Sequence, residues 1–241
     1  MLELVEIQGI ARQGMTQPLI CRGDNGKLYY AKGKAATASG LIKEWMAANL
    51  AKALELPIPI FHIAYIDEKL IKHSDISTNS LGSGHIFVSE QVQATTEFKY
   101  PLLKQVSEKV QRDILLFDLW VENSDRTLTA LGGNPNLLWQ SLDNELYIID
   151  HNLAFDDAFN INDFKDTHVF QSQLANFQLD LIDKQHFEAK MMDSLKNWQQ
   201  WWDAIPDIWK QENTGSMQFK PERILQRLID EAKGRLWEKY L

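Results

Sequence analysis

The spacing of the hydrophobic residues changes near residue 100 of this sequence. Before that point short apolar runs alternate with turn residues, and Asn25-Gly26 lies between two such runs, which is a strong signal for a β-hairpin. After it, apolar residues recur at helical spacing, as in Val110, Ile114 and Phe117. The change predicts an α+β protein with a small strand-rich N-terminal lobe and a larger, mainly helical C-terminal lobe.

The predicted elements follow from this pattern. We expect strands at 18–21, 27–32, 61–66, 70–71 and 86–92, and a helix over 40–54 that the prolines of 56–59 terminate. One hairpin, formed by 136–139 and 145–150, interrupts the helical part, which then runs on from residue 163 with breaks near Pro206 and Pro221. The seam between the lobes falls within 89–96, so we divide the chain into 1–92 and 93–241.

Composition and charge exclude several classes of protein. The chain has 241 residues, 44% of them hydrophobic, and a formal charge of −8. That acidic balance disfavours a nucleic-acid partner, which requires a basic face. The single cysteine, Cys21, fits a reducing cytoplasm, and no apolar run approaches the ~20 residues of a membrane span. Five of the eight tryptophans fall in the C-terminal third, where we expect them to pack in the core.

Phosphoryl transfer from ATP requires a particular set of parts. A glycine-containing loop and a lysine approach the phosphates, a carboxylate orients the acceptor, and an Asn and an Asp bind Mg²⁺. Protein-kinase-like folds supply these parts in a fixed chain order. This chain offers candidates in that order: Gly14 and Thr16 in the loop, Lys32 at a strand end, Glu44 on the following helix, Glu90 and Val92 in the strand beside an adenine, then Asp125, Asn136 and Asp150.

The hairpin predicted between the helices would bring several of these residues together. Asn136 lies at its entrance and Asp150 at its exit, so two oxygen ligands are expected to meet at one end of a two-stranded ribbon. Asp125 lies in the loop that leads into it. An Asp that ends a nearly apolar strand is costly unless it has a partner or a metal. We therefore predict that these three residues surround one Mg-nucleotide.

Three segments resemble the HipA-like kinase family, in particular its shorter, stand-alone branch: Asn123 to Thr127 (NSDRT), Asn134 to Leu138 (NPNLL) and Leu146 to His151 (LYIIDH). The resemblance implies a bilobed, protein-kinase-like fold related to phosphoinositide kinases. It also implies ATP and Mg²⁺ as cofactors and a hydroxyl acceptor, as in Ser/Thr protein kinases. In the roles that it implies, Asp125 is catalytic, Asn136 and Asp150 bind the metal, and Lys32 contacts the phosphates.

Two features depart from the usual kinase pattern. Asn136 follows Asp125 by eleven residues, a longer spacing than in ordinary protein kinases, and Gly132-Gly133 lies within the added length. Asn134 is therefore a rival metal ligand. Asp150-His151-Asn152 also replaces Asp-Phe-Gly, so a switch based on that Phe is not assumed.

Other interpretations of the same residues stay open at this stage. Lys34 competes with Lys32, and Glu44 could be an ordinary surface glutamate. Arg126 is interpreted as a brace for the catalytic loop, and His151 either supports the metal site or packs. We expect the two acids before the loop, Asp118 and Glu122, to lie on the helix surface. The longer loop also fits a non-catalytic nucleotide-binding module, and a small-molecule or lipid-headgroup kinase is a third possibility.

Overall fold

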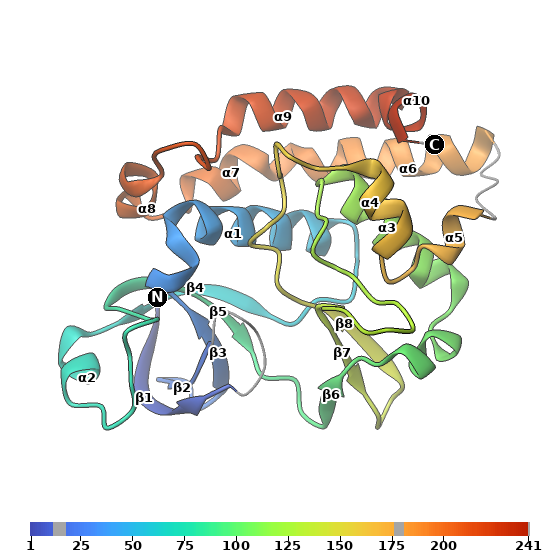
Figure 1. Cartoon of the computed structure of the whole chain (residues 1–241). Coiled ribbons are helices and arrows are strands. Elements are labelled where there is room, and N and C mark those ends of the chain that lie inside the picture. The colour runs from blue at the N-terminus through green and yellow to red at the C-terminus, as the bar shows by residue number, and fades with distance from the viewer. Residues whose placement is uncertain (12–17, 176–180, 241) are drawn as a thin grey trace.

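A computed structural model describes residues 1–11, 18–175 and 181–240 (Figure 1). Within these residues, five strands close into a barrel in the order β1-β2-β3-β5-β4. They are β1 (Leu2–Ile10), β2 (Leu19–Gly23), β3 (Leu28–Lys32), β4 (Phe61–Ile66) and β5 (Gly84–Glu90). The predicted hairpin is confirmed as β2 and β3, while β1 was not located from the sequence. The barrel closes where β1 runs parallel to β4, and the other pairs are antiparallel.

Alternation along the strands fills the barrel with apolar side chains. On β2 and β3, Leu19, Cys21, Tyr29 and Ala31 point inward and are buried. One predicted strand was wrong: 70–71 belongs to the short helix α2 (Glu68–Lys72). Asp67 caps that helix by accepting a hydrogen bond from the backbone N–H of Lys69 at 2.7 Å, and this local signal outweighed the apolar pair.

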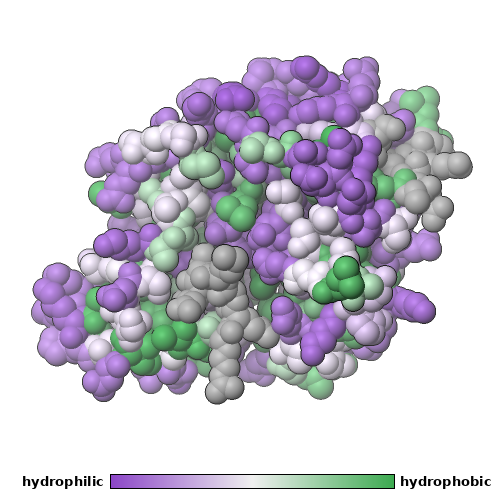
Figure 2. All heavy atoms as spheres, viewed as in Figure 1, coloured by the Kyte–Doolittle hydropathy of each residue, from purple (hydrophilic) through white to green (hydrophobic). Residues whose placement is uncertain are grey.

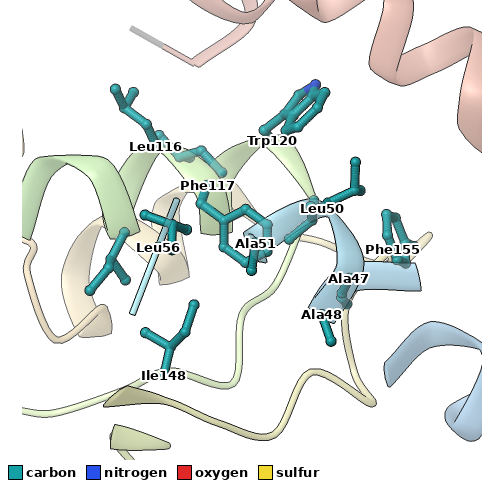
Figure 3. Close-up of a cluster of buried hydrophobic side chains, with 14 of the residues drawn as sticks. Ala47, Ala48, Leu50, Ala51, Leu56, Leu116, Phe117, Trp120, Ile148 and Phe155 are labelled. Atoms are coloured by element: carbon teal, nitrogen blue, oxygen red, sulfur yellow. The ribbon is translucent and has the colours of Figure 1, made fainter. Parts of the chain in front are cut away.

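Helix α1 (Thr37–Ala53) joins the barrel to the helical part. It packs against β5 and against the C-terminal helices α7 and α8. Its small side chains Ala47, Ala48 and Ala51 are fully buried and belong to the same hydrophobic core as Phe117 of α3 (Figure 3). The prediction of a helix over 40–54 is therefore confirmed, with a start three residues earlier.

The C-terminal part is mainly helical, as predicted. Its helices are α3 (Glu108–Trp120), α4 (Ile161–Thr167), α5 (Ser172–Ala175), α6 (Leu181–Ser194), α7 (Trp198–Asp203), α8 (Asp207–Glu212), α9 (Pro221–Asp230) and α10 (Leu236–Tyr240). Helices α8 and α9 begin directly after or at the two expected prolines. Trp198, Trp209 and Trp237 are buried, which confirms their packing role. The outer side of this part, around α9, is largely hydrophilic (Figure 2).

The second sheet differs from the prediction of a lone hairpin. β7 (Leu137–Gln140) and β8 (Glu145–Ile148) do pair, but β6 (Thr95–Glu97) adds a third strand along β7. Three residues are too few to show a period of two, so the sequence alone did not reveal β6. The chain passes from the barrel to this sheet between 90 and 95. The division at 92/93 stays a prediction.

No helix among the described residues is long and apolar enough to span a bilayer. A β-rich N-terminal part followed by a helical C-terminal part is thus the observed architecture, in agreement with the predicted order of elements.

Candidate active site

A cleft of about 280 Å³ lies between the barrel and the second sheet. Most of its lining is apolar and comes from both sides, including Ile20, Tyr30, Ile58, Phe61, Phe87, Leu137 and Ile148. Its polar lining includes Lys32, Glu44, Asn134, Asn136, Asp150 and His151. The cleft therefore combines a slot for a flat apolar group with a set of charged and amide side chains.

Lys32 links the two parts of the protein. It ends β3, and its Nζ lies 2.9 Å from Oε2 of Glu44 and 2.7 Å from Oδ1 of Asp150. Burial alone would lower the pKa of Lys32, but the two carboxylates stabilise its charged form and raise that pKa above its usual range. Lys34 is exposed in the following turn, so Lys32 is the lysine that lies in the cleft.

Glu44 of α1 is buried, contrary to the surface alternative. Burial would raise its pKa, but the charge of Lys32 and the hydrogen bond from His151 outweigh that effect and lower it to about 2. His151 Nδ1 lies 3.5 Å from Glu44 Oε1, and the His151 ring meets Phe117 edge-on at a centroid distance of 5.9 Å. His151 Nε2 is buried and has no hydrogen-bond partner in the described part of the chain.

Asp125 is held by two amides. Its Oδ2 accepts hydrogen bonds from Nδ2 of Asn136 at 2.7 Å and from Nδ2 of Asn134 at 3.2 Å. Burial raises the pKa of Asp125, the nearby Asp150 adds to this, and the hydrogen bond from Asn136 opposes it. Asn136 is buried and Asn134 is exposed, yet both line the cleft, so the rivalry between them stays open.

The residues between Asp125 and Asn136 fold back on themselves. The backbone N–H of Thr127 donates to the carbonyl of Asn134 at 2.9 Å, and Thr129 pairs with Gly132. Gly133 has a φ of +154°, and a Cβ there would lie 2.5 Å from the carbonyl oxygen of Thr127. This small turn brings Asn134 back beside Asp125 despite the long spacing between Asp125 and Asn136.

The ends of β7 and β8 are joined beside the cleft. The N–H of Ile149 donates to the carbonyl of Asn136 at 3.0 Å. Asn136 and Asp150 both have left-handed backbone angles, with φ of +47° and +58°. Residues other than glycine adopt such angles at a cost, and they persist where the surroundings hold them.

The prediction that Asp118 lies on the helix surface was wrong. It is fully buried, not on the helix surface, and its Oδ2 accepts from Nε of Arg126 at 2.7 Å and lies 3.1 Å from Nε2 of His168. Burial would raise its pKa, but Arg126 and His168 lower it to about 2. A signal was available: Asp118 follows Ile114 by four residues, on the apolar face of α3, where an acid requires a cation.

Glu122 also departs from the prediction of a surface acid. Its carboxylate lies 2.9 Å from Nζ of Lys239 and 3.3 Å from Nη1 of Arg227, in a largely buried cluster away from the cleft.

The remaining predicted cofactor contacts divide into three groups. Glu90 lines the cleft, although its carboxylate pairs with Lys27 at 2.9 Å and its N–H donates to the carbonyl of Ile60 at 2.7 Å. Val92 is absent from the described lining, and its carbonyl accepts from Thr95 Oγ1 at 3.0 Å. Gly14 and Thr16 lie outside the described residues.

The donor set fits a metal that is shared with phosphates. Among the described residues, no group of three or more His, Cys, Asp or Glu side chains could hold an ion by itself. Nδ2 of Asn136 donates to Asp125 and Oδ1 of Asp150 accepts from Lys32, so the oxygens that face a metal are Oδ1 of Asn136 and Oδ2 of Asp150. Mg²⁺ typically binds through one or two such protein oxygens and completes its shell with phosphate oxygens and water.

Comparison with known families assigns this chain to the kinase-type phosphotransferases. A family model described as HipA-like kinase matches residues 4–240. The chain therefore belongs to the HipA-like kinase family, which confirms the resemblance noted in its motifs. No curated protein matches the sequence significantly.

The solved structures that are distantly similar include two that align with nearly all of this chain. One is the proinflammatory kinase CtkA of Helicobacter pylori, at 13% identity and a TM-score of 0.45, with 99% of this chain and 97% of that chain covered. The other is LicA in complex with AMP, at 13% identity and a TM-score of 0.37, with 97% of this chain and 93% of that chain covered.

Proposed function

We propose that this protein is an ATP- and Mg²⁺-dependent phosphotransferase that moves the γ-phosphate to a hydroxyl acceptor. The observation that carries the proposal is the position of Lys32, which bridges Glu44 of α1 and Asp150 beyond β8 within one cleft. The barrel and the helical part would then be the two lobes of a protein-kinase-like fold, divided at 92/93.

Each side of the cleft supports a part of the nucleotide. The apolar walls would take the adenine, and among them the rings of Phe61 and Phe87 are stacked at a centroid distance of 5.9 Å. Lys32 would contact the α- and β-phosphates, and Glu44 would keep its ammonium group in place. Lys32 Nζ also donates to Oδ1 of Asp150 at 2.7 Å, which places the ammonium group next to the proposed metal ligand.

Asn136 and Asp150 would hold Mg²⁺ through the two side-chain oxygens that remain available. The ion, when bound, neutralises charge on the β- and γ-phosphates. Asn134 is the alternative amide, since it also lines the cleft.

Asp125 would orient the acceptor and take its proton. Its raised pKa makes the carboxylate a better base than an exposed aspartate. In the proposed reaction the acceptor oxygen forms a bond to the γ-phosphorus while the bond to the ADP oxygen breaks, and the hydroxyl proton passes to Asp125. Asn136 and Asn134 fix the carboxylate through their amide hydrogens. Positioning and charge neutralisation would provide most of the rate.

The acceptor class that the family resemblance favours is a protein Ser or Thr, with a small-molecule or lipid-headgroup hydroxyl as the alternative. A non-catalytic nucleotide-binding module is the second candidate function. One observation favours it: both amides contact the same oxygen of Asp125, so the carboxylate is already engaged.

Two substitutions test the proposal with calorimetry and labelled ATP. We expect Asp150→Ala to abolish both Mg-nucleotide binding and phosphate transfer, because it removes a metal ligand. We expect Asp125→Ala to retain binding and lose transfer. Asp143→Ala, in the exposed turn of the same hairpin, is the matched control and should behave as the wild type. Full activity in both cleft variants contradicts the mechanism, and wild-type binding without transfer to any acceptor supports the non-catalytic module.

A further inference from the structure

We propose that Arg126 is a positioning residue for the metal: anchored by Asp118, its guanidinium fixes the backbone beside both residues that would bind the ion. The inference rests on the proposed function, in which Asn136 and Asp150 hold Mg²⁺. Arg126 is fully buried and does not line the cleft within the described residues, so it acts through these neighbours and not on the substrate.

The contacts of Arg126 converge on the two proposed ligands. Its Nη1 donates to the carbonyl of Asn136 at 2.5 Å and to the carbonyl of Ile149 at 3.3 Å. The first carbonyl belongs to one ligand, and the second belongs to the residue directly before the other, Asp150. A single nitrogen of Arg126 therefore joins the start of β7 to the end of β8, where Asn136 and Asp150 would have to stay close to bind one ion.

The backbone at these positions needs such a restraint. Both ligands have left-handed φ angles, +47° at Asn136 and +58° at Asp150. Residues other than glycine adopt this conformation infrequently, Asn and Asp more readily than most, and hydrogen bonds from the surroundings help to hold it. The hydrogen bonds from Arg126 are placed to enforce it at both residues at once.

Asp118 fixes the orientation of the guanidinium. It accepts from Arg126 Nε at 2.7 Å and from Asn123 Nδ2 at 2.8 Å. His168 completes the set: its Nδ1 accepts from the N–H of Phe170 at 3.1 Å, so its proton lies on Nε2, which donates to Asp118 at 3.1 Å. A buried ion pair with its hydrogen bonds satisfied in this way is rigid, and its removal is costly.

Arg126→Lys is the main test. Lysine keeps a positive charge near Asp118, but its shorter reach and single ammonium group cannot reproduce the planar fork that joins the carboxylate to both carbonyls. Mg²⁺ is titrated by calorimetry into protein saturated with ADP, and ADP is titrated separately without metal. We expect the Mg²⁺ affinity to fall by about tenfold or more, as for other groups that hold metal ligands, and the metal-free ADP affinity to change by less than about twofold.

Arg227→Lys is the matched control. Arg227 also joins carboxylates and a carbonyl, with Glu231 at 2.9 Å, Glu122 at 3.3 Å and the carbonyl of Trp120 at 2.9 Å, but it has no contact with the cleft. We expect a lower Tm with unchanged Mg²⁺ affinity. If Arg126→Lys also lowers the Tm and leaves Mg²⁺ affinity unchanged, the role of Arg126 is only structural and the inference is overturned.

A second variant decides the matter if Arg126→Lys does not fold. The His168 ring stacks on Phe164 at a centroid distance of 4.5 Å. His168→Phe keeps a stacked ring at this position but removes the donor to Asp118. A loss of Mg²⁺ affinity of about threefold or more supports the inference, and an unchanged affinity overturns it. Wild-type protein that shows no Mg²⁺-dependent ADP binding would refute the proposed function itself, which separates the two failures.

Discussion

The substitution Glu44→Gln tests how much the buried contact with Lys32 stabilises the protein. Glutamine has nearly the same shape and can still hydrogen-bond to the lysine, but it cannot carry the charge. In the folded protein the pKa of Glu44 lies at about 2 instead of 4.5: burial would raise it, and Lys32 and His151 lower it by more. Because this acid's pKa is depressed on folding, its stabilisation is fully present above pH 4.5 and is lost as the pH falls toward 2.

The expected magnitude follows from that shift. A shift of this size corresponds to about 3 kcal/mol of free energy at pH 7, at 1.36 kcal/mol for each pKa unit. The raised pKa of Lys32 reflects this same pair together with its contact to Asp150, so it is no separate contribution. Loss of one partner from a buried pair typically costs about 3–5 kcal/mol, and Lys32 keeps its contact with Asp150 at 2.7 Å, so the lower end applies.

Urea unfolding at pH 7, followed by tryptophan fluorescence, measures the effect. We expect Glu44→Gln to lower the free energy of unfolding by about 3 kcal/mol. Glu55→Gln is the control, since Glu55 lies just beyond the same helix, is 83% exposed and meets Lys190 only at 3.6 Å. It should change stability by less than about 0.5 kcal/mol. Equal stability of wild type and Glu44→Gln would refute the reasoning.

Three further predictions concern other parts of the fold. Gly133→Ala should destabilise the protein by more than Gly132→Ala in urea unfolding. Both positions have positive φ, which costs a residue with a side chain about 1–3 kcal/mol. Only at Gly133 does an added Cβ also meet a backbone oxygen, at 2.5 Å. Equal losses would mean that the loop relaxes. The pKa of Asp118 is about 2, against 3.8 for a free carboxyl. Asp118 should therefore contribute about 2 kcal/mol to the free energy of unfolding, a contribution that is present above pH 3.8 and is lost as the pH falls toward 2. Asp118→Asn should remove this part of the pH dependence of the free energy of unfolding. If the free energy of the variant varies with pH as in the wild type, the depressed pKa of Asp118 is contradicted. Cys21 is buried in the barrel, and burial raises the pKa of its thiol to about 12, so a thiol reagent should modify it only in urea. Rapid modification of the native protein would show that the barrel opens.

Much of the architecture was predictable because its signals are local. The Asn25-Gly26 turn between apolar runs predicted β2 and β3, and the helical spacing of Ile114 and Phe117 predicted α3. The chain order of Lys32, Glu44, Asn136 and Asp150 anticipated side chains that all line one cleft. Their catalytic roles stay predictions.

Other features depended on contacts between residues far apart in the chain. β6 is recognisable only by its pairing with β7, and the barrel closes only where β1 meets β4. The burial of Glu44 likewise depends on Lys32 and His151, which come from other elements.

The sequence by itself determined the types of most elements, though not of β1, β6 and α2, and the order of the candidate site residues, because the periodicity of side chains and the chemistry of turns are encoded within a few neighbouring residues. Only the tertiary structure decided the environment of Asp118 and Arg126. They are fully buried and paired at 2.7 Å, whereas Asp118 was predicted to lie on the surface. A carboxylate is stable in the interior only when a cation and hydrogen-bond donors surround it, and those partners here include His168, fifty residues further along the chain.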